Sequence, residues 1–487
     1  MLSSATSVMF WWLILGSFEA ASCSNASILS YFKLSKGTYR LDFTLDEFPP
    51  YSMTKSESFV IDLAKFLNQT ETYVNLNLKN LNLVSVEFNT IQNTTSNKIY
   101  FDLHLVDHQN SRLTIRSINL ATSIYLNNNQ IRYFSAYENV SKKVDHNSYK
   151  MNFKDLRLDF NRLSQLNGSS CFNNLVFEKL TYLDLSYNQI EDIGSDCFHR
   201  LTSLTSLLLI SNNLTIIRVN QFNGLKKLED LSLKSNQIEF IEEKSFAGLR
   251  SLKLLSLCEN NISFLNQKEL EELNLLDNLL LNGNKIETLE NFSFKNVKTW
   301  QISLSMNRIR TIRRSHFSGN HYLDSLYLWS NSIESIEDEA FADCKYITDL
   351  SFDTNNLKVI KQKTLTGLVS LQVLVLDSNQ IDLIEEDSFS DQKNLRNLFI
   401  RWNRLKNITR GAFRGLSRLD ILFLIGNQIE FIDDEAFRPL IKLTALELSE
   451  NSIKSIAKQN SLFHLPKLVY INYNQNPIEY FEAGSFD

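Results

Sequence analysis

The stretch Leu180-Thr-Tyr-Leu-Asp-Leu-Ser-Tyr-Asn-Gln-Ile-Glu-Asp-Ile193 contains the pattern that decides the fold of this chain. Its apolar frame recurs through the rest of the sequence together with its asparagine. The recurring asparagines are Asn188, Asn212, Asn236, Asn260, Asn284, Asn307, Asn331, Asn355, Asn379, Asn403, Asn427, Asn451 and Asn476. They lie 24 residues apart, except for one interval of 23 that ends at Asn307 and one of 25 that ends at Asn476. A fixed period of this length predicts a solenoid of stacked repeats.

Within each repeat, alternating apolar residues such as Leu183 and Leu185 predict a short strand with one buried face. One strand per repeat, stacked in parallel, gives a long sheet. The asparagine follows the strand, where its amide can bond to backbone groups of its own and the neighbouring repeat. A second buried ladder is expected from Phe198, Phe222, Phe246, Phe294, Phe317, Phe341, Phe389, Phe413 and Phe437, with Leu270 and Leu365 at this position in two repeats.

The composition favours one extended body over small domains on flexible linkers, because the 487 residues include only 13 Gly and 5 Pro. A net charge of −5 with mixed signs disfavours nucleic acid or an anionic membrane as the main partner. The apolar run Met9–Gly16, followed by the small residues 20–22, predicts a cleaved signal peptide over residues 1–22. No transmembrane segment is expected in this chain.

Beyond the signal peptide, the repeat register divides the chain into three parts. Residues 23–70 show shorter apolar alternations and are expected to form an N-terminal cap. Residues 71–179 contain degenerate repeats of the same frame, and residues 180–487 contain regular ones, the last of them incomplete. Because an open solenoid end needs a cap, the sequence leaves open whether the C-terminus is truncated or covered by something else.

Glycosylation acceptor motifs point to the same extracellular compartment as the signal peptide. The asparagines that begin N-x-S/T are Asn25, Asn68, Asn93, Asn139, Asn167, Asn213, Asn261, Asn291 and Asn407. The sequence therefore predicts a secreted glycoprotein, or a cell-surface one if a C-terminal anchor is missing from this chain.

The cysteines do not form the paired motifs of a zinc site. Cys171 and Cys197 occupy matching positions in consecutive repeats, which predicts a disulfide between them in an oxidising compartment. Two buried, unbonded thiols are the alternative. Cys344 takes a leucine position and is expected in the core, whereas Cys258 and Cys23 are candidates for a free thiol or an intermolecular bridge.

The repeat pattern L-x-x-L-x-L-x-x-N-x-I-x-x-I-x-x-x-x-F-x-x-L resembles the typical 24-residue class of extracellular leucine-rich repeats, as in Toll-type receptor ectodomains, Slit, chaoptin and the acid-labile subunit. The resemblance covers roughly residues 70–487. It implies an α/β solenoid, a leucine-rich repeat horseshoe with a parallel β-sheet on the concave face and short helical or irregular turns on the convex face. The cysteine-rich flanks, membrane helix and intracellular domain of such receptors are absent from the sequence, so a receptor role is not carried over.

Function should then lie with the strand residues that face outward from the concave sheet. Most of them are small or polar, but the repeats between residues 327 and 425 carry large side chains at these positions. The candidate partner-binding residues are Tyr327, Trp329, Val375, Phe399, Arg401, Trp402, Phe423 and Ile425. Exposed aromatic residues with an arginine are typical of interface hot spots. The alternatives are that these side chains pack on one another or are covered by a homodimer mate.

An enzyme is not expected, because the sequence contains no nucleophile elbow and no phosphate-binding glycine loop. His104 and His108 lack a third metal ligand and are interpreted as a surface pair. No metal or cofactor is expected. The sequence favours binding of an extracellular protein ligand or receptor through the concave face, in a recognition, signalling or innate-immunity role. The alternative is a structural matrix or cell-adhesion protein that self-associates through that face.

Overall fold

The computed structural model describes residues 154–167, 172, 177–265, 267–270, 273, 276–291, 293–294, 297–456 and 465–481, and before residue 154 it describes Leu126, Ile131 and the backbone of nine strands. The predicted signal peptide, Cys23, Cys171, His108 and the glycosylation candidates Asn25, Asn68, Asn93 and Asn139 lie outside the described residues. Among the described residues, no helix has both the length and the apolar character that a membrane span requires.

The chain forms two compact units, one of residues 1–214 and 221–228 and one of residues 215–220 and 229–487. In the first unit, an antiparallel pair of strands is followed by strands that pair in parallel. These strands are β1 (Ile28–Ser35), β2 (Thr38–Leu45), β4 (Glu71–Asn77), β6 (Asn97–His104), β8 (Ala121–Tyr125), β10 (Asp155–Arg157), β12 (Tyr182–Asp184) and β14 (Ser206–Leu208). Two-stranded parallel ladders accompany them: β3 (Ser58–Asp62) with β5 (Ser85–Asn89), β7 (Arg112–Thr114) with β9 (Tyr133–Ser135), and β11 (Gln165–Leu166) with β13 (Asp192–Ile193).

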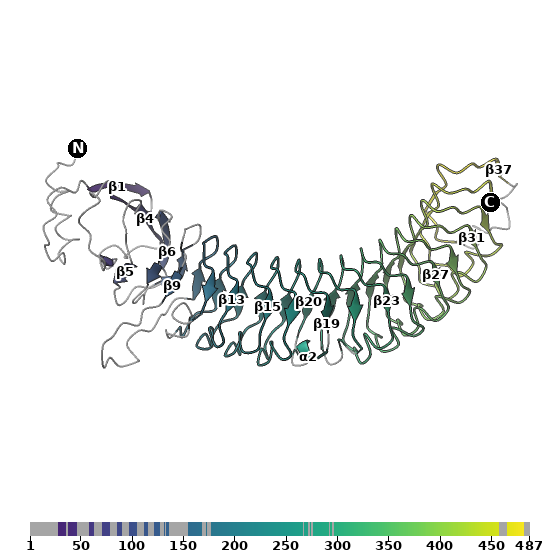
Figure 1. Cartoon of the computed structure of the whole chain (residues 1–487). Coiled ribbons are helices and arrows are strands. Elements are labelled where there is room, and N and C mark those ends of the chain that lie inside the picture. Colours follow the sequence, from purple (N-terminus) through teal and green to yellow (C-terminus); the bar gives the residue numbers. More distant parts are fainter. Residues whose placement is uncertain are drawn as a thin grey trace. The chain divides into compact units, whose positions relative to one another are not determined.

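The second unit contains a long parallel sheet to which each repeat contributes one strand (Figure 1). Its strands are β16 (Asp230–Ser232), β18 (Leu254–Ser256), β20 (Asn278–Leu280), β22 (Gln301–Ser303), β24 (Ser325–Tyr327), β26 (Asp349–Ser351), β28 (Val373–Val375), β30 (Asn397–Phe399), β32 (Ile421–Phe423), β34 (Ala445–Glu447) and β36 (Tyr470–Asn472). The solvent side of these strands, which the sequence predicts to be the concave one, is referred to below as the long-sheet face. The predicted solenoid with a parallel sheet is confirmed.

The opposite side of the second unit consists of turns and two-residue ladders with almost no helix. The ladders are β15 (Ile216–Ile217) with β17 (Phe240–Ile241), β19 (Phe264–Leu265) with β21 (Thr288–Leu289), β23 (Thr311–Ile312) with β25 (Ser335–Ile336), β27 (Val359–Ile360) with β29 (Leu383–Ile384), β31 (Asn407–Ile408) with β33 (Phe431–Ile432), and β35 (Ser455–Ile456) with β37 (Tyr480–Phe481). One α-helical turn is described there, α2 (Gln267–Leu270). The expected turns are therefore mostly irregular rather than helical.

The core of each coil consists of the leucines of the repeat frame and the phenylalanine ladder, which are buried. Adjacent ladder rings stack, with centroids 5.5 Å apart for Phe294 and Phe317 and 6.0 Å apart for Phe413 and Phe437. Leu270 and Leu365, which replace phenylalanine, are buried at the same position. Because these rings pack against rings of adjacent coils, the core of one coil depends on its neighbours.

The ladder asparagines join neighbouring coils through buried hydrogen bonds. Asn355 donates through Nδ2 to the carbonyl of Leu328 in the preceding coil (2.9 Å) and of Phe352 in its own coil (3.0 Å). Its Oδ1 accepts a bond from the backbone N–H of Ile333 at 2.9 Å. Equivalent bonds recur at Asn379 and Asn451. The amide thus completes backbone bonding where the chain leaves the strand, as the spacing predicts.

The described cysteines are all buried. Cys197 is 0% exposed, and its carbonyl accepts a bond from the N–H of Phe172 at 3.1 Å. Its pairing with Cys171 stays a prediction. Cys344 is a buried free thiol, as expected for a core position. Cys258, two residues before Asn260, is also free, which is one of the two alternatives that the sequence leaves, but its side chain is only 5% exposed. Its Sγ donates to Oδ1 of Asn282 at 3.0 Å, which turns the thiol into the sheet surface.

We expect Cys258 and Cys344 to react with iodoacetamide at pH 8 at least about tenfold more slowly in the folded protein than in guanidinium, because the thiolate is the nucleophile. Burial raises the pKa of Cys258 and raises that of Cys344 to about 12, so little thiolate forms at this pH. Peptide mapping after timed alkylation measures both rates. Equal rates in the two conditions would show that the thiols are accessible.

Candidate functional site

Large side chains occupy one row of the long-sheet face on three consecutive strands. Val375 on β28 is in register with Phe399 on β30, which is in register with Phe423 on β32. The two rings meet edge to face, with centroids 5.4 Å apart and an interplanar angle of 66°. All three side chains are half-buried, whereas the leucines beside them, Leu398 and Leu422, are fully buried. The row therefore exposes part of its apolar surface while the core beneath it is closed.

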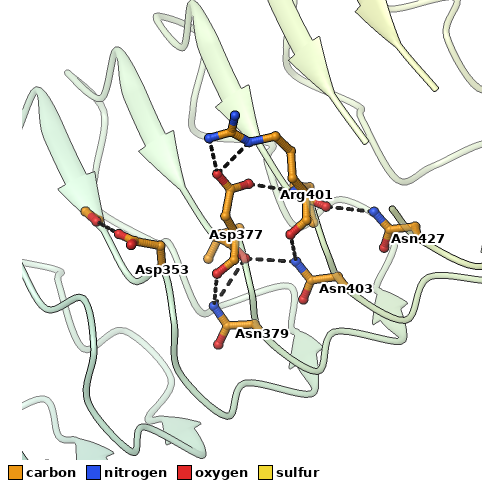
Figure 2. Close-up of polar contacts among 9 residues, drawn as sticks. Asp353, Asp377, Asn379, Arg401, Asn403 and Asn427 are labelled. Atoms are coloured by element: carbon orange, nitrogen blue, oxygen red, sulfur yellow. Dashed lines mark hydrogen bonds and ion pairs between the residues drawn. The ribbon is translucent and has the colours of Figure 1, made fainter. Parts of the chain in front are cut away.

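A parallel row, two residues before each ladder asparagine, carries the charged groups of the site. Arg401 donates to Oδ2 of Asp377 through Nε at 2.7 Å and through Nη2 at 2.6 Å, and its backbone N–H donates to Oδ1 of Asp377 (Figure 2). Its guanidinium carbon lies 5.4 Å from the centroid of the Phe399 ring. Asp377 is 7% exposed, so this carboxylate fixes the guanidinium over the Phe399 ring.

Trp402 lies beside this pair in the turn before Asn403. It has a left-handed backbone (φ 57°), its N–H donates to the carbonyl of Ile425 at 2.8 Å, and its side chain is 50% exposed. A Cβ added to Gly426 would lie 2.2 Å from Cε3 of the Trp402 ring. The missing side chain of Gly426 is therefore what lets the indole lie on the next coil. The name aromatic patch is used below for Val375, Phe399, Arg401, Trp402, Phe423 and Ile425.

The structure does not bring the other two predicted residues into this patch. Tyr327 on β24 is in register with Ser351 on β26, which is in register with Val375. One strand with a small side chain therefore separates Tyr327 from Val375, a distance of about 10 Å at ordinary strand spacing. Trp329, half-buried like Tyr327, follows the same strand. The predicted band from 327 to 425 is divided into a patch of six residues and a separate pair.

Acidic groups border the aromatic patch. Asp353, one coil before Asp377, is half-buried and accepts a bond from Ser351. On the other side, Phe423 is in register with Glu447. Burial disfavours the charge of Glu447, but bonds from Ser449, Tyr470 and Asn472 outweigh it and lower the pKa of this carboxyl. The patch is therefore an apolar centre with a partly negative rim.

Asp377 was not assigned to the site from the sequence, although a signal for it exists. It precedes its ladder asparagine by two residues, as Arg401 does one repeat later. Opposite charges 24 residues apart at one repeat position predict a pair on adjacent strands. The first unit holds a second aromatic group that the sequence reasoning missed: Phe160 and Tyr187, each just before a ladder asparagine, stack with centroids 4.3 Å apart.

The glycosylation candidates that the structure describes lie away from the strands of the long sheet. Asn167 follows β11, Asn291 follows β21, and Asn407 lies in β31; all three are exposed. Asn213 and Asn261 directly follow ladder asparagines and are half-buried. Within the described ranges, no group of three or more His, Cys, Asp or Glu side chains is placed to hold a metal ion.

Several solved structures share this fold at low sequence identity. The Drosophila Toll–Spätzle complex in its glycosylated form matches with a TM-score of 0.65 and 17% identity, over 95% of this chain and 67% of that one. A TLR13–ssRNA13 complex matches with a TM-score of 0.55 and 19% identity, over 87% of this chain and 77% of that one. The plant peptide hormone receptor RGFR1 in complex with RGF2 matches with a TM-score of 0.54 and 20% identity, over 85% of this chain and 71% of that one. No curated protein matches the chain in sequence.

Family profiles match most of the repeat region. The profile described as "Leucine rich repeat" matches residues 152–214, 202–257, 227–286 and 426–478. The profile described as "BspA type Leucine rich repeat region (6 copies)" matches residues 260–371 and 311–438. Together with the 24-residue spacing and the parallel strand of each coil, these matches show that the chain belongs to the leucine-rich repeat proteins.

Proposed function

We propose that this chain is a secreted or cell-surface glycoprotein that binds an extracellular protein ligand or receptor through the aromatic patch, in a recognition, signalling or innate-immunity role. The observation that carries the proposal is the ring pair of Phe399 and Phe423, half-buried on a sheet face with mostly small or polar residues, with the Arg401 guanidinium held over the Phe399 ring. Aromatic residues and arginine at the centre of a patch, with polar groups at its rim, are the composition of protein interfaces.

The charges around the patch favour a protein partner over a nucleic acid. Arg401 is neutralised by Asp377, while Asp353 and Glu447 add negative charge beside it. Nucleic acid binding depends on basic groups that neutralise phosphates. The Toll–Spätzle and RGFR1–RGF2 structures support binding of a protein or peptide by this fold, although the TLR13 structure contains RNA.

Secretion is proposed from the signal-like N-terminus and the glycosylation motifs. Glycans at the exposed Asn167, Asn291 and Asn407 would leave the long-sheet face open, as a binding face requires. A Cys171–Cys197 disulfide belongs to the same proposal, because it needs an oxidising compartment.

The test is the double variant Phe399→Ala/Phe423→Ala. Removing both rings should weaken binding to the partner by about 2 kcal/mol or more, because hot-spot aromatics dominate interface energies. Fold stability should fall by only about 1 kcal/mol from the lost ring contact, since Leu398 and Leu422 stay in place. Surface plasmon resonance against a panel of secreted proteins of the same species measures binding, and thermal melting measures stability.

Glu386→Gln is the matched control, because Glu386 is exposed in a turn on the other side of the coil. It should bind like the unaltered protein. Full binding by a folded double variant would contradict the proposal and place recognition elsewhere. The alternative, a matrix or adhesion protein that self-associates through this face, predicts instead a stable dimer in light scattering that the double variant abolishes.

A further inference from the structure

A second surface feature lies at the start of three neighbouring strands of the long sheet, outside the aromatic patch. Asp277, Trp300 and Asp324 each precede the first residue of β20, β22 and β24. Backbone bonds join them directly, from Trp300 N–H to the Asp277 carbonyl at 3.0 Å and from Asp324 N–H to the Trp300 carbonyl at 2.8 Å. They line a hollow of about 380 Å³, called here the acidic tryptophan pocket, which consists of Asp277, Asn278, Trp300, Gln301, Asp324 and Ser325.

The middle coil of this arrangement is the shortened repeat that ends at Asn307. In the coils before and after it, Leu276 and Leu323 fill the core position next to the pocket and are buried. In the shortened coil this position holds Thr299, which is also buried and whose hydroxyl lies 3.0 Å from the carbonyl oxygens of Asp277 and of Gln301. The next residue, Trp300, projects outward and is 65% exposed. An indole therefore lies between two aspartates at the same repeat position on the neighbouring strands.

Other charged side chains in this row of the solenoid are already paired. Lys253 binds Glu229 at 2.9 Å, and Arg396 lies 3.7 Å from Asp420. Neither Asp277 nor Asp324 forms a close ion pair within the part of the chain that the structure describes, and Lys253, bonded to Glu229, adds only a longer-range attraction to Asp277.

A hydrogen bond orients the carboxylate of Asp324. Asp324 accepts a bond from the hydroxyl of Ser325 at 3.0 Å, and the Thr348 hydroxyl oxygen lies 3.1 Å from Asp324 Oδ1 and 2.7 Å from Asp349 Oδ2. The basic residue nearest to Trp300 in sequence, Lys298, lies over the ring of Tyr322 instead, 5.7 Å from its centroid.

We propose that the acidic tryptophan pocket binds an arginine side chain presented by a protein partner. The guanidinium plane stacks on the exposed face of Trp300, and its N–H groups donate to the carboxylates of Asp277 and Asp324 on either side. Arginine fits better than lysine, because a planar group with several donors can stack and reach both carboxylates at once. A metal ion does not fit, because two strand spacings, about 10 Å, separate the backbones that carry the carboxylates.

This inference does not depend on the aromatic patch, which lies on β28, β30 and β32. A partner that used both sites would be anchored at two places along the sheet, one apolar and one charged. The two sites can be tested separately, because none of their residues is shared.

The probe is an acetylated and amidated tetra-arginine peptide, added to protein that carries 5-fluorotryptophan. The ¹⁹F resonance of Trp300, assigned with Trp300→Phe, should shift on titration, and tetra-lysine should bind at least about threefold more weakly. The double variant Asp277→Asn/Asp324→Asn should lower the affinity for tetra-arginine at least about tenfold, because both carboxylate acceptors are lost.

The control variant Asp338→Asn/Asp382→Asn changes the net charge equally at exposed positions elsewhere, and should alter the affinity less than about twofold. Calorimetry of tetra-arginine binding to Trp300→Ala gives a second measure of the affinity that depends on the indole. This substitution removes an exposed ring without opening the core. Three outcomes would overturn the proposal: a Trp300 resonance that does not shift, equal losses in the two double variants, or tetra-lysine binding as tight as tetra-arginine.

Discussion

Replacing Asn355 with alanine is expected to lower the free energy of unfolding by about 1–3 kcal/mol. The substitution removes the side-chain acceptor of the Ile333 N–H, whereas the carbonyls of Leu328 and Phe352 keep bonds from Asn331 and Asn379. Asn355 is 5% exposed, so water does not replace the amide without opening the coil. Each buried group left unpaired costs about 1–3 kcal/mol. Urea denaturation followed by circular dichroism measures the change.

Because repeat proteins can unfold in parts, the same variant should also be followed by hydrogen exchange. The amide proton of Ile333 loses its acceptor and should exchange faster than those of distant coils. Asn394→Ala is the control, because Asn394 bonds the carbonyl of Val369 at the exposed surface. It should cost less than about 1 kcal/mol. Equal effects of the two substitutions would contradict the role assigned to the asparagine ladder.

Replacing Gly415 with alanine is expected to lower the free energy of unfolding by about 2–6 kcal/mol, for two separable reasons. The residue has φ +102°, a conformation in which a side chain is strained by about 1–3 kcal/mol. An added Cβ would also lie 2.3 Å from the carbonyl oxygen of Phe389 and 2.9 Å from Cα of Ser390. Since these atoms belong to the backbone of the previous coil, the coils must move apart, which costs about a further 1–3 kcal/mol.

Gly248→Ala separates the two contributions. Gly248 occupies the same repeat position with φ +89°, but an added Cβ would meet no atom within 4 Å. This variant should therefore show the backbone strain alone, about 1–3 kcal/mol. Thermal or urea unfolding of both variants gives the difference directly. If Gly415→Ala is as stable as Gly248→Ala, the backbone of the previous coil can move away from the added Cβ without a loss of stability, and the expected clash is contradicted.

Much of the fold follows from the spacing of residues along the chain. A period of 24 residues predicted the coils, and the alternation of Leu183 and Leu185 predicted a parallel sheet with one buried face. The asparagine and phenylalanine ladders could be predicted because each must fill the same buried place in every coil. Periodicity is sufficient there, since a stacked repeat repeats its environment.

For the candidate site, the sequence could predict only which side chains face outward from the sheet. Spacing placed Val375, Phe399 and Phe423 on the outer side of the sheet, where the structure also finds them. It did not pair Arg401 with Asp377, and it treated Tyr327 as part of the same band. Whether two outward side chains touch depends on their rotamers and on the residue that lies on the strand between them. The repeat spacing determines neither.

The tertiary structure decided the features that break the repeat. Cys258 stands at an outward position, but its thiol turns toward Asn282 and is buried. Trp300 precedes its ladder asparagine by seven residues, as Asp277 and Asp324 do, but only the packed coils show that the three residues line one hollow. A repeat pattern specifies the backbone path that all coils share. The side-chain contacts between particular coils are set by the residues in which those coils differ, and these act only once the coils are stacked.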